Sequence, residues 1–198
     1  MKPVIWLLGL SGSGKTTLGS LLRLFLESQG EDVAFIDENI FRARQEGVLE
    51  DAELEEALRE HVLECQAQGR VCIVCAVSAS AESRRRNRAQ LPFYHEIWVR
   101  CSLDTLVRRD PRGLYARAEA GETVCIPGLS HCFDEPLTAH AVIDTDCDLT
   151  ESYMNLRCAA LEILERNSDW QELRRELALG SGPAMPMPDL SGCRIQGS

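Results

Sequence analysis

The sequence predicts an α/β protein with a five-stranded parallel sheet flanked by helices, and three observations support this class. Short apolar runs alternate along the chain with longer helix-like stretches, the order that right-handed β-α-β crossovers require. The apolar runs are almost continuous in Val, Ile and Cys, as in parallel strands that are covered on both faces. The chain has 198 residues, of which 44% are apolar and 26% charged, enough for one domain with a sizeable core.

The expected bounds of each strand and helix lie where the sequence changes between an apolar run and an amphipathic stretch. Strands are expected at the apolar runs over residues 4–10, 33–37, 71–77, 96–101 and 141–145. Helices are expected at the intervening amphipathic stretches over residues 15–28, 50–68, 81–90, 103–109, 150–166 and 170–179. The acidic start of the 50–68 stretch suits the positive end of a helix dipole.

Two stretches lie outside this alternation. Residues 110–136 are rich in Gly, Pro and charge and too long for a simple turn, so a lid or binding loop is expected there. The end of the chain is rich in Gly, Pro, Ser and Met and has little periodicity. The sequence therefore predicts one domain over residues 1–178 and a disordered tail over residues 179–198.

The charge balance restricts the partners. Lys and Arg total 21 against 31 Asp and Glu, a net charge of −10, so no basic face for nucleic acid or an anionic membrane is expected. No apolar run approaches the ~20 residues of a membrane span. The apolar start is interrupted by glycines and Lys15 and has no cleavage-site pattern, so it is not interpreted as a signal peptide.

The nine cysteines favour buried, reduced thiols over a metal site or a disulfide framework. Cys72 and Cys75 form a C-x-x-C within an expected strand, where residues three apart point to opposite faces and do not bind one metal. Reduced thiols are typical of the cytoplasm, which is the expected location.

A phosphate-binding loop is the strongest motif. Residues 9–16 (GLSGSGKT) match G-x-x-x-x-G-K-[ST] between an expected strand and an expected helix. Glycines let the backbone wrap a phosphate, Lys15 reaches the β- and γ-phosphates, and the Thr16 hydroxyl holds Mg²⁺. The alternative is a glycine-rich turn that matches by chance. The expected contacts of ATP here are Gly9, Ser11, Gly12, Ser13, Gly14, Lys15, Thr16 and Thr17.

Other motifs indicate which kind of nucleotide protein this is. The chain lacks the Asn-Lys-x-Asp guanine reader of GTPases. Its third expected strand runs into Ala76, Val77 and Ser78 rather than ending in the Asp of motor or transporter ATPases. A small phosphotransferase remains, with the phosphate acceptor bound at the carboxyl ends of the strands.

Candidate acceptor residues follow the second and third strands. Asp37 ends the second strand, where a carboxylate can take the proton of an attacking hydroxyl or hold Mg²⁺; capping a helix is a compatible alternative. Arg42, one turn later, either binds an anionic acceptor or is a solvated surface residue. Ser78 and Arg84 bring a hydroxyl and a guanidinium to the next strand end, where they can bind phosphate or sulfate.

Basic residues also open the expected lid. Arg109 and Arg112 are positioned to neutralise the transferred phosphoryl group while the lid excludes water.

Together these segments resemble the adenylylsulfate kinase family, which phosphorylates the 3′-hydroxyl of adenosine 5′-phosphosulfate. The resemblance covers roughly residues 4 to 166 and is most specific at 109–115 (RDPRGLY), with Glu135-Pro136 and Asp144-Thr145 downstream. It implies the P-loop kinase fold, ATP with Mg²⁺, a small anionic nucleotide-like acceptor and a homodimer. The acceptor contacts that it implies are Arg42, Ser78, Arg84 and Leu114.

The departures from this family concern the acceptor. Its Asp-Gly-Asp becomes Asp37-Glu38-Asn39, which loses the second acid, and residues 47–54 (GVLEDAEL) lack its arginine and phenylalanine. Ile126 stands where the family has a stacking phenylalanine in the lid. Adenylylsulfate is the expected acceptor; the alternatives are a related kinase acting on cytidine diphosphoramidate and a nucleotide-binding regulator with weak catalysis.

Overall fold

Five parallel strands form the centre of the part of the chain that the structure describes. This structure is a computed structural model, and it describes residues 1–45, 50–78, 80–110, 113–120 and 133–167. The spatial order of the strands is β2-β3-β1-β4-β5, so the chain starts in the middle of the sheet. The strands are β1 (Val4–Leu8), β2 (Val33–Asp37), β3 (Val71–Ala76), β4 (Tyr94–Arg100) and β5 (Ala141–Asp144). The predicted fold class is therefore confirmed.

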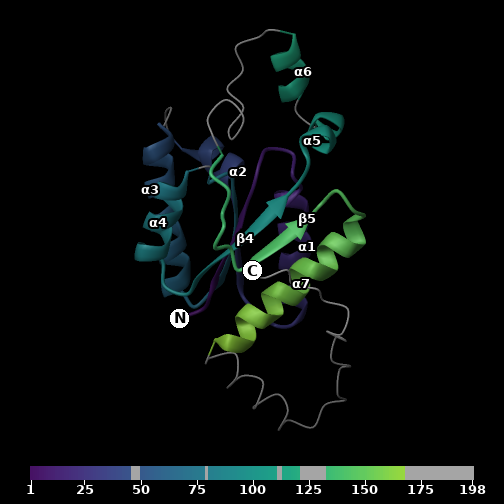
Figure 1. Cartoon of the computed structure of the whole chain (residues 1–198). Helices are drawn as coiled ribbons and strands as arrows, with labels where there is room; N and C mark the ends of the chain where they lie inside the picture. The colour runs from purple at the N-terminus through teal and green to yellow at the C-terminus, as the bar shows by residue number, and fades with distance from the viewer. Residues whose placement is uncertain (46–49, 79, 111–112, 121–132, 168–198) are drawn as a thin grey trace.

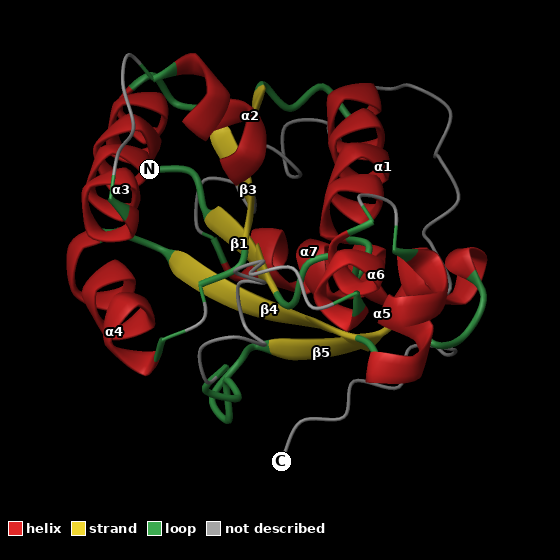
Figure 2. Ribbon diagram, turned by 90° about the horizontal axis from the view of Figure 1, so that it is seen from above, coloured by secondary structure: helices red, strands yellow, loops and turns green. Residues whose placement is uncertain are grey.

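Helices cover both faces of this sheet, as the view from above shows (Figure 2). One face carries α1 (Lys15–Ser28) and α7 (Leu149–Arg166), and the other carries α3 (Asp51–Ala67) and α4 (Ala81–Gln90). Three short helices lie near the carboxyl ends of the strands (Figure 1): α2 (Glu38–Arg44), α5 (Leu103–Arg109) and α6 (Leu114–Glu119). The sequence did not predict α2 or α6, because these short segments show no apolar periodicity.

The core has one layer on each face of the sheet. All five residues of β1 are buried, and they alternate between the layers. Ile5 and Leu7 belong to the layer under α1 and α7, whereas Val4 packs with the residues of α3. This two-sided burial explains why the strand sequences are continuously apolar.

The cysteines of β3 confirm the argument from strand geometry. Cys72 belongs to the layer under α3 and Cys75 to the layer under α1, and both thiols are free. Burial raises the pKa of Cys72 to about 12. The expectation that no cysteine is paired is wrong for Cys158 of α7, which is disulfide-bonded.

Several predictions fall wholly or partly outside the described residues. The helix over 170–179 and the tail over 179–198 lie there, as does most of the lid after residue 120. Among the helices that the structure does describe, none combines the length and the apolar character that a membrane crossing needs.

Candidate active site

The loop between β1 and α1 takes the backbone conformation that its glycines permit. Gly9, Gly12 and Gly14 have φ values of 150°, 85° and 97°. A Cβ atom on Gly9 would lie 2.3 Å from the carbonyl oxygen of Val99, so this glycine is required by the close approach of β4. Gly14 is the N-cap of α1, and the loop therefore leads directly into the positive end of that helix.

Lys15 lies across this loop and is largely buried. Its Nζ donates hydrogen bonds of 2.8 Å to the carbonyl oxygens of Gly9 and Leu10. The hydroxyl of Ser13 is also buried, and it has no hydrogen-bond partner among the described residues. The loop thus holds an ammonium group and an unpaired hydroxyl beside a run of backbone amides, which suits a bound polyphosphate.

Asp37 connects the loop to the end of β2. Its side chain is 5% exposed, and its Oδ2 accepts a hydrogen bond of 2.6 Å from the hydroxyl of Thr16. Its other oxygen, Oδ1, accepts from the backbone N–H groups of Asn39 at 3.0 Å and Ile40 at 3.3 Å, which caps α2. The cap that the sequence suggested for Asp37 is therefore present, and its other oxygen faces the first turn of α1, where the suggested role toward a hydroxyl or Mg²⁺ stays a prediction.

The short helix α2 supplies a second group of charged side chains. The carboxylate of Glu38 accepts a hydrogen bond of 2.8 Å from the backbone N–H of Val77, which ties α2 to the end of β3. Arg42 Nη2 lies 2.7 Å from Asp51 Oδ1 and 3.7 Å from Glu38 Oε1. Arg42 therefore lies where the sequence expected it, but it is already paired with two carboxylates of this chain.

Two residues to which the sequence gave no role brace the other side of the loop. The hydroxyl of Thr145, just after β5, donates to the carbonyl oxygen of Ser13 at 3.0 Å, and Arg109 donates to both oxygens of Thr145. The hydroxyl of Tyr115 donates to the carbonyl oxygen of Ser11 at 2.8 Å, and burial raises its pKa to about 12. Both residues belong to segments that resemble the family, and this resemblance is the sequence feature from which a role for them could have been predicted.

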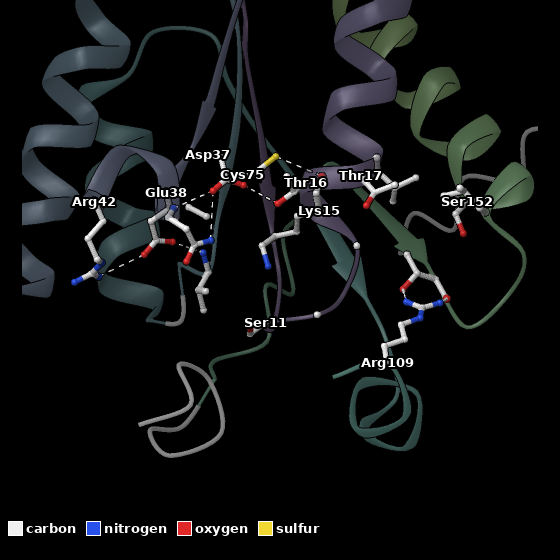
Figure 3. Close-up of a pocket in the computed structure, with 18 of the residues that line it drawn as sticks. Ser11, Lys15, Thr16, Thr17, Asp37, Glu38, Arg42, Cys75, Arg109 and Ser152 are labelled. Atoms are coloured by element: carbon white, nitrogen blue, oxygen red, sulfur yellow. Dashed lines mark hydrogen bonds and ion pairs between the residues drawn. The ribbon is translucent and has the colours of Figure 1, made fainter. Parts of the chain in front are cut away.

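These groups line one cavity at the carboxyl end of the sheet. Its volume is about 610 Å³, within the range of nucleotide-sized ligand sites. Figure 3 shows Arg42 and Glu38 at one end, Lys15 and Thr16 in the middle, and Arg109 and Ser152 at the other end. Cys75 lies behind the loop, and burial raises the pKa of its thiol far above the usual value, so this thiol is uncharged.

Ser78 and Arg84 are not brought into this cavity. Ser78 Oγ accepts a hydrogen bond of 2.9 Å from Trp6 Nε1, and Arg84 Nη1 donates one of 2.9 Å to the Ser78 carbonyl oxygen. Both residues are buried, and they hold the turn after β3. Arg112 and the side chain of Leu114 lie outside the described part of the chain, so the contacts expected of them stay predictions.

Known proteins are similar to this chain in both sequence and architecture. The family model described as adenylylsulphate kinase matches residues 1–144. A probable adenylyl-sulfate kinase of Archaeoglobus fulgidus is 35% identical over 151 residues, which are 74% of this chain and 97% of that protein. A cytidine diphosphoramidate kinase of Campylobacter jejuni is 32% identical over 73% of this chain and 86% of its own length.

Solved structures agree with the sequence comparison. The Mycobacterium tuberculosis APS kinase in complex with AMPPNP and APS superposes with a TM-score of 0.68 at 28% identity, over 83% of this chain and 98% of that one. The sheet, the phosphate loop and the matched length together show that the chain belongs to the adenylylsulphate kinase family of P-loop kinases.

Proposed function

We propose that this protein transfers the γ-phosphoryl group of ATP to the 3′-hydroxyl of adenosine 5′-phosphosulfate. The observation that carries the proposal is the 2.6 Å contact between Asp37 and Thr16. It sets a buried carboxylate at the end of β2 directly against the first turn after the phosphate loop, where a donor phosphate and an acceptor alcohol would meet.

The donor side is assigned to the loop and its neighbours. The amides of residues 9–16 surround the phosphates, with Ser11, Gly12, Ser13 and Thr17 among their contacts. Lys15 exchanges its bonds to the Gly9 and Leu10 carbonyls for the β- and γ-phosphates. Arg109, held by Thr145, adds positive charge at the far end of the cavity, and Arg112 is proposed to join it from the lid.

Mg²⁺ fits the pair formed by Thr16 and Asp37. A hydroxyl and a carboxylate oxygen are the hard ligands that this ion takes from proteins, and here they already lie within 2.6 Å of each other. Thr16 is the proposed direct ligand. When bound, the ion would neutralise charge on the β- and γ-phosphate oxygens.

Asp37 is the proposed base of the transfer. The acceptor oxygen forms a bond to the γ-phosphorus, the bond from that phosphorus to the β,γ-bridging oxygen breaks, and ADP leaves with that oxygen. The hydroxyl proton passes to the Asp37 carboxylate. Arg42 and Leu114 are proposed to contact the acceptor, with Ser78 and Arg84 holding the turn beneath it.

The test is turnover by the purified full chain. With Mg²⁺-ATP and adenylylsulfate we expect release of ADP and a product that carries one additional phosphate on the ribose, identified by mass spectrometry and phosphorus NMR. ADP release that does not depend on adenylylsulfate, without any phosphorylated nucleotide, would contradict the proposal.

Cytidine diphosphoramidate is the second candidate acceptor. The Campylobacter jejuni relative bears the name of that activity at nearly the same identity. Residues 47–54 also lack the arginine and phenylalanine that the family resemblance led us to expect. Turnover with this acceptor alone selects the alternative, and binding of ATP without turnover on either acceptor selects a regulator.

The wider organisation belongs to the same proposal. We expect one domain over residues 1–178, a lid over about 110–136, a homodimer and a cytoplasmic location. Light scattering of the purified chain measures the oligomeric state, and limited proteolysis with and without ATP reports whether the lid closes.

A further inference from the structure

The charges of the cavity are separated between its two ends. Among the lining residues that the structure describes, the cation Lys15 lies in the middle of the cavity and the cation Arg109 at one end (Figure 3). The charged side chains at the opposite end are Asp37, Glu38, Arg42 and Asp51. That end therefore has three carboxylates and one guanidinium, although the proposed acceptor is itself an anion.

Asp37 alone does not account for this excess of negative charge. It faces Thr16 and the proposed metal ion, which would offset its charge. Glu38 and Asp51 remain, and both lie next to Arg42. The guanidinium that would attract an acceptor is thus already within 2.7 Å of a carboxylate.

The Asp51 carboxylate can compete with an anionic acceptor for the Arg42 guanidinium. Asp51 is the first residue of α3, its side chain is 87% exposed, and it pairs with Arg42, whose side chain is 42% exposed. An ion pair this exposed is weak, so a ligand can displace it at small cost. Glu38, in contrast, is held by the Val77 N–H and keeps its place.

We propose that Asp51 is a specificity-determining positioning residue that occupies Arg42 and so disfavours acceptors with a highly charged anionic group. An acceptor whose group bears fewer negative charges, or an N–H in place of an oxygen, leaves the pair intact. A fully ionised phosphosulfate must first displace the Asp51 carboxylate. This inference rests on the proposed function, because it assumes that the acceptor binds at this end of the cavity.

The experiment compares Asp51→Asn with Glu60→Gln. Glu60 is an exposed residue of the same helix that does not line the cavity, so its exchange removes the same charge elsewhere. For Asp51→Asn we expect the KM for adenylylsulfate to fall about three- to five-fold in low salt, the effect of one exposed ion pair, with kcat and the KM for ATP unchanged. The difference should shrink in about 0.5 M salt because screening weakens both pairings. Asp51→Glu should restore the wild-type KM, and Glu60→Gln should not move it.

Each other outcome is decisive. A KM that is unchanged in Asp51→Asn relative to Glu60→Gln overturns the inference and leaves the proposed function standing. A higher KM also overturns it, because Asp51 would then contact the acceptor itself. If the wild-type chain turns over no acceptor, the proposed function fails. The inference about Asp51 is then tested by calorimetric binding of adenylylsulfate to the wild-type chain and to Asp51→Asn. Tighter binding to Asp51→Asn supports the inference, whereas equal binding or none overturns it.

Discussion

Replacing Asp37 with asparagine separates the chemistry of this residue from its structural role. Asparagine keeps the size of the side chain and one carbonyl oxygen, which can still accept from the backbone N–H groups of Asn39 and Ile40. The exchange removes the negative charge and the oxygen that accepts from Thr16. The cap of α2 therefore survives, while the proposed base is lost.

The two effects differ greatly in size. Asn and Asp are nearly equal as N-caps, so the free energy of unfolding should change by less than about 1 kcal/mol. For a chain of this length that corresponds to a shift in Tm of about 2–4 °C. Loss of a general base lowers kcat about 100- to 10,000-fold. Affinity for ATP should change little, since Lys15 and the loop amides are untouched.

The assay is steady-state ADP release with adenylylsulfate, together with calorimetric binding of ATP and a thermal melt. Asp148→Asn is the matched control, because Asp148 caps α7 in the same way and accepts from the Thr150 N–H at 2.6 Å. It should leave kcat unchanged. If Asp37→Asn reduced kcat no more than this control, or weakened ATP binding as much as turnover, Asp37 would be a cap and no base.

Three further predictions follow from the loop and the rim of the sheet. Lys15→Ala should lower kcat at least about 100-fold, as loss of a phosphate-stabilising charge does, with an unchanged circular dichroism spectrum; full activity would remove Lys15 from the donor site. Gly9→Ala should lower the free energy of unfolding by about 1–3 kcal/mol, because the new Cβ would lie 2.3 Å from the Val99 carbonyl oxygen; urea titration measures this, and an unchanged midpoint contradicts it. Burial, with help from His140, lowers the pKa of His95 to about 4. The unfolded chain takes up this proton near pH 6.5 and the folded chain only near pH 4, a difference of about 3 kcal/mol at full strength. Because His95 is only half-buried, solvent screening reduces the expected loss of stability to about 2 kcal/mol as the pH is lowered from 6.5 to 4, with no further loss from this group below pH 4. His95→Gln should flatten the profile, and a parallel profile would refute the assignment.

Much of the fold was predictable because buried parallel strands have a characteristic sequence pattern. Burial on both faces makes each strand continuously apolar, and the phosphate loop marks where β1 meets α1. The approach of Asp37 to Thr16 follows from the same logic, because the carboxyl ends of β2 and β1 lie at one edge of the sheet.

What the sequence could not provide are contacts between residues far apart in the chain. The bond from Tyr115 to Ser11 and the bond from Trp6 to Ser78 depend on the path of the chain across the sheet. Sequence periodicity reports burial within one element and carries no such partner information. Arg42 shows the same limit: its candidate role was visible, but its pairing with Asp51 on another helix was not.

The most direct test of the central claim is a crystal structure of the full chain with Mg²⁺, a non-hydrolysable ATP analogue and adenylylsulfate. We predict that the amides of residues 9–16 wrap the triphosphate and that the acceptor 3′-oxygen lies about 3 Å from the Asp37 carboxylate, in line with the γ-phosphorus. A nucleotide bound away from this loop, or an acceptor hydroxyl remote from Asp37, would contradict it.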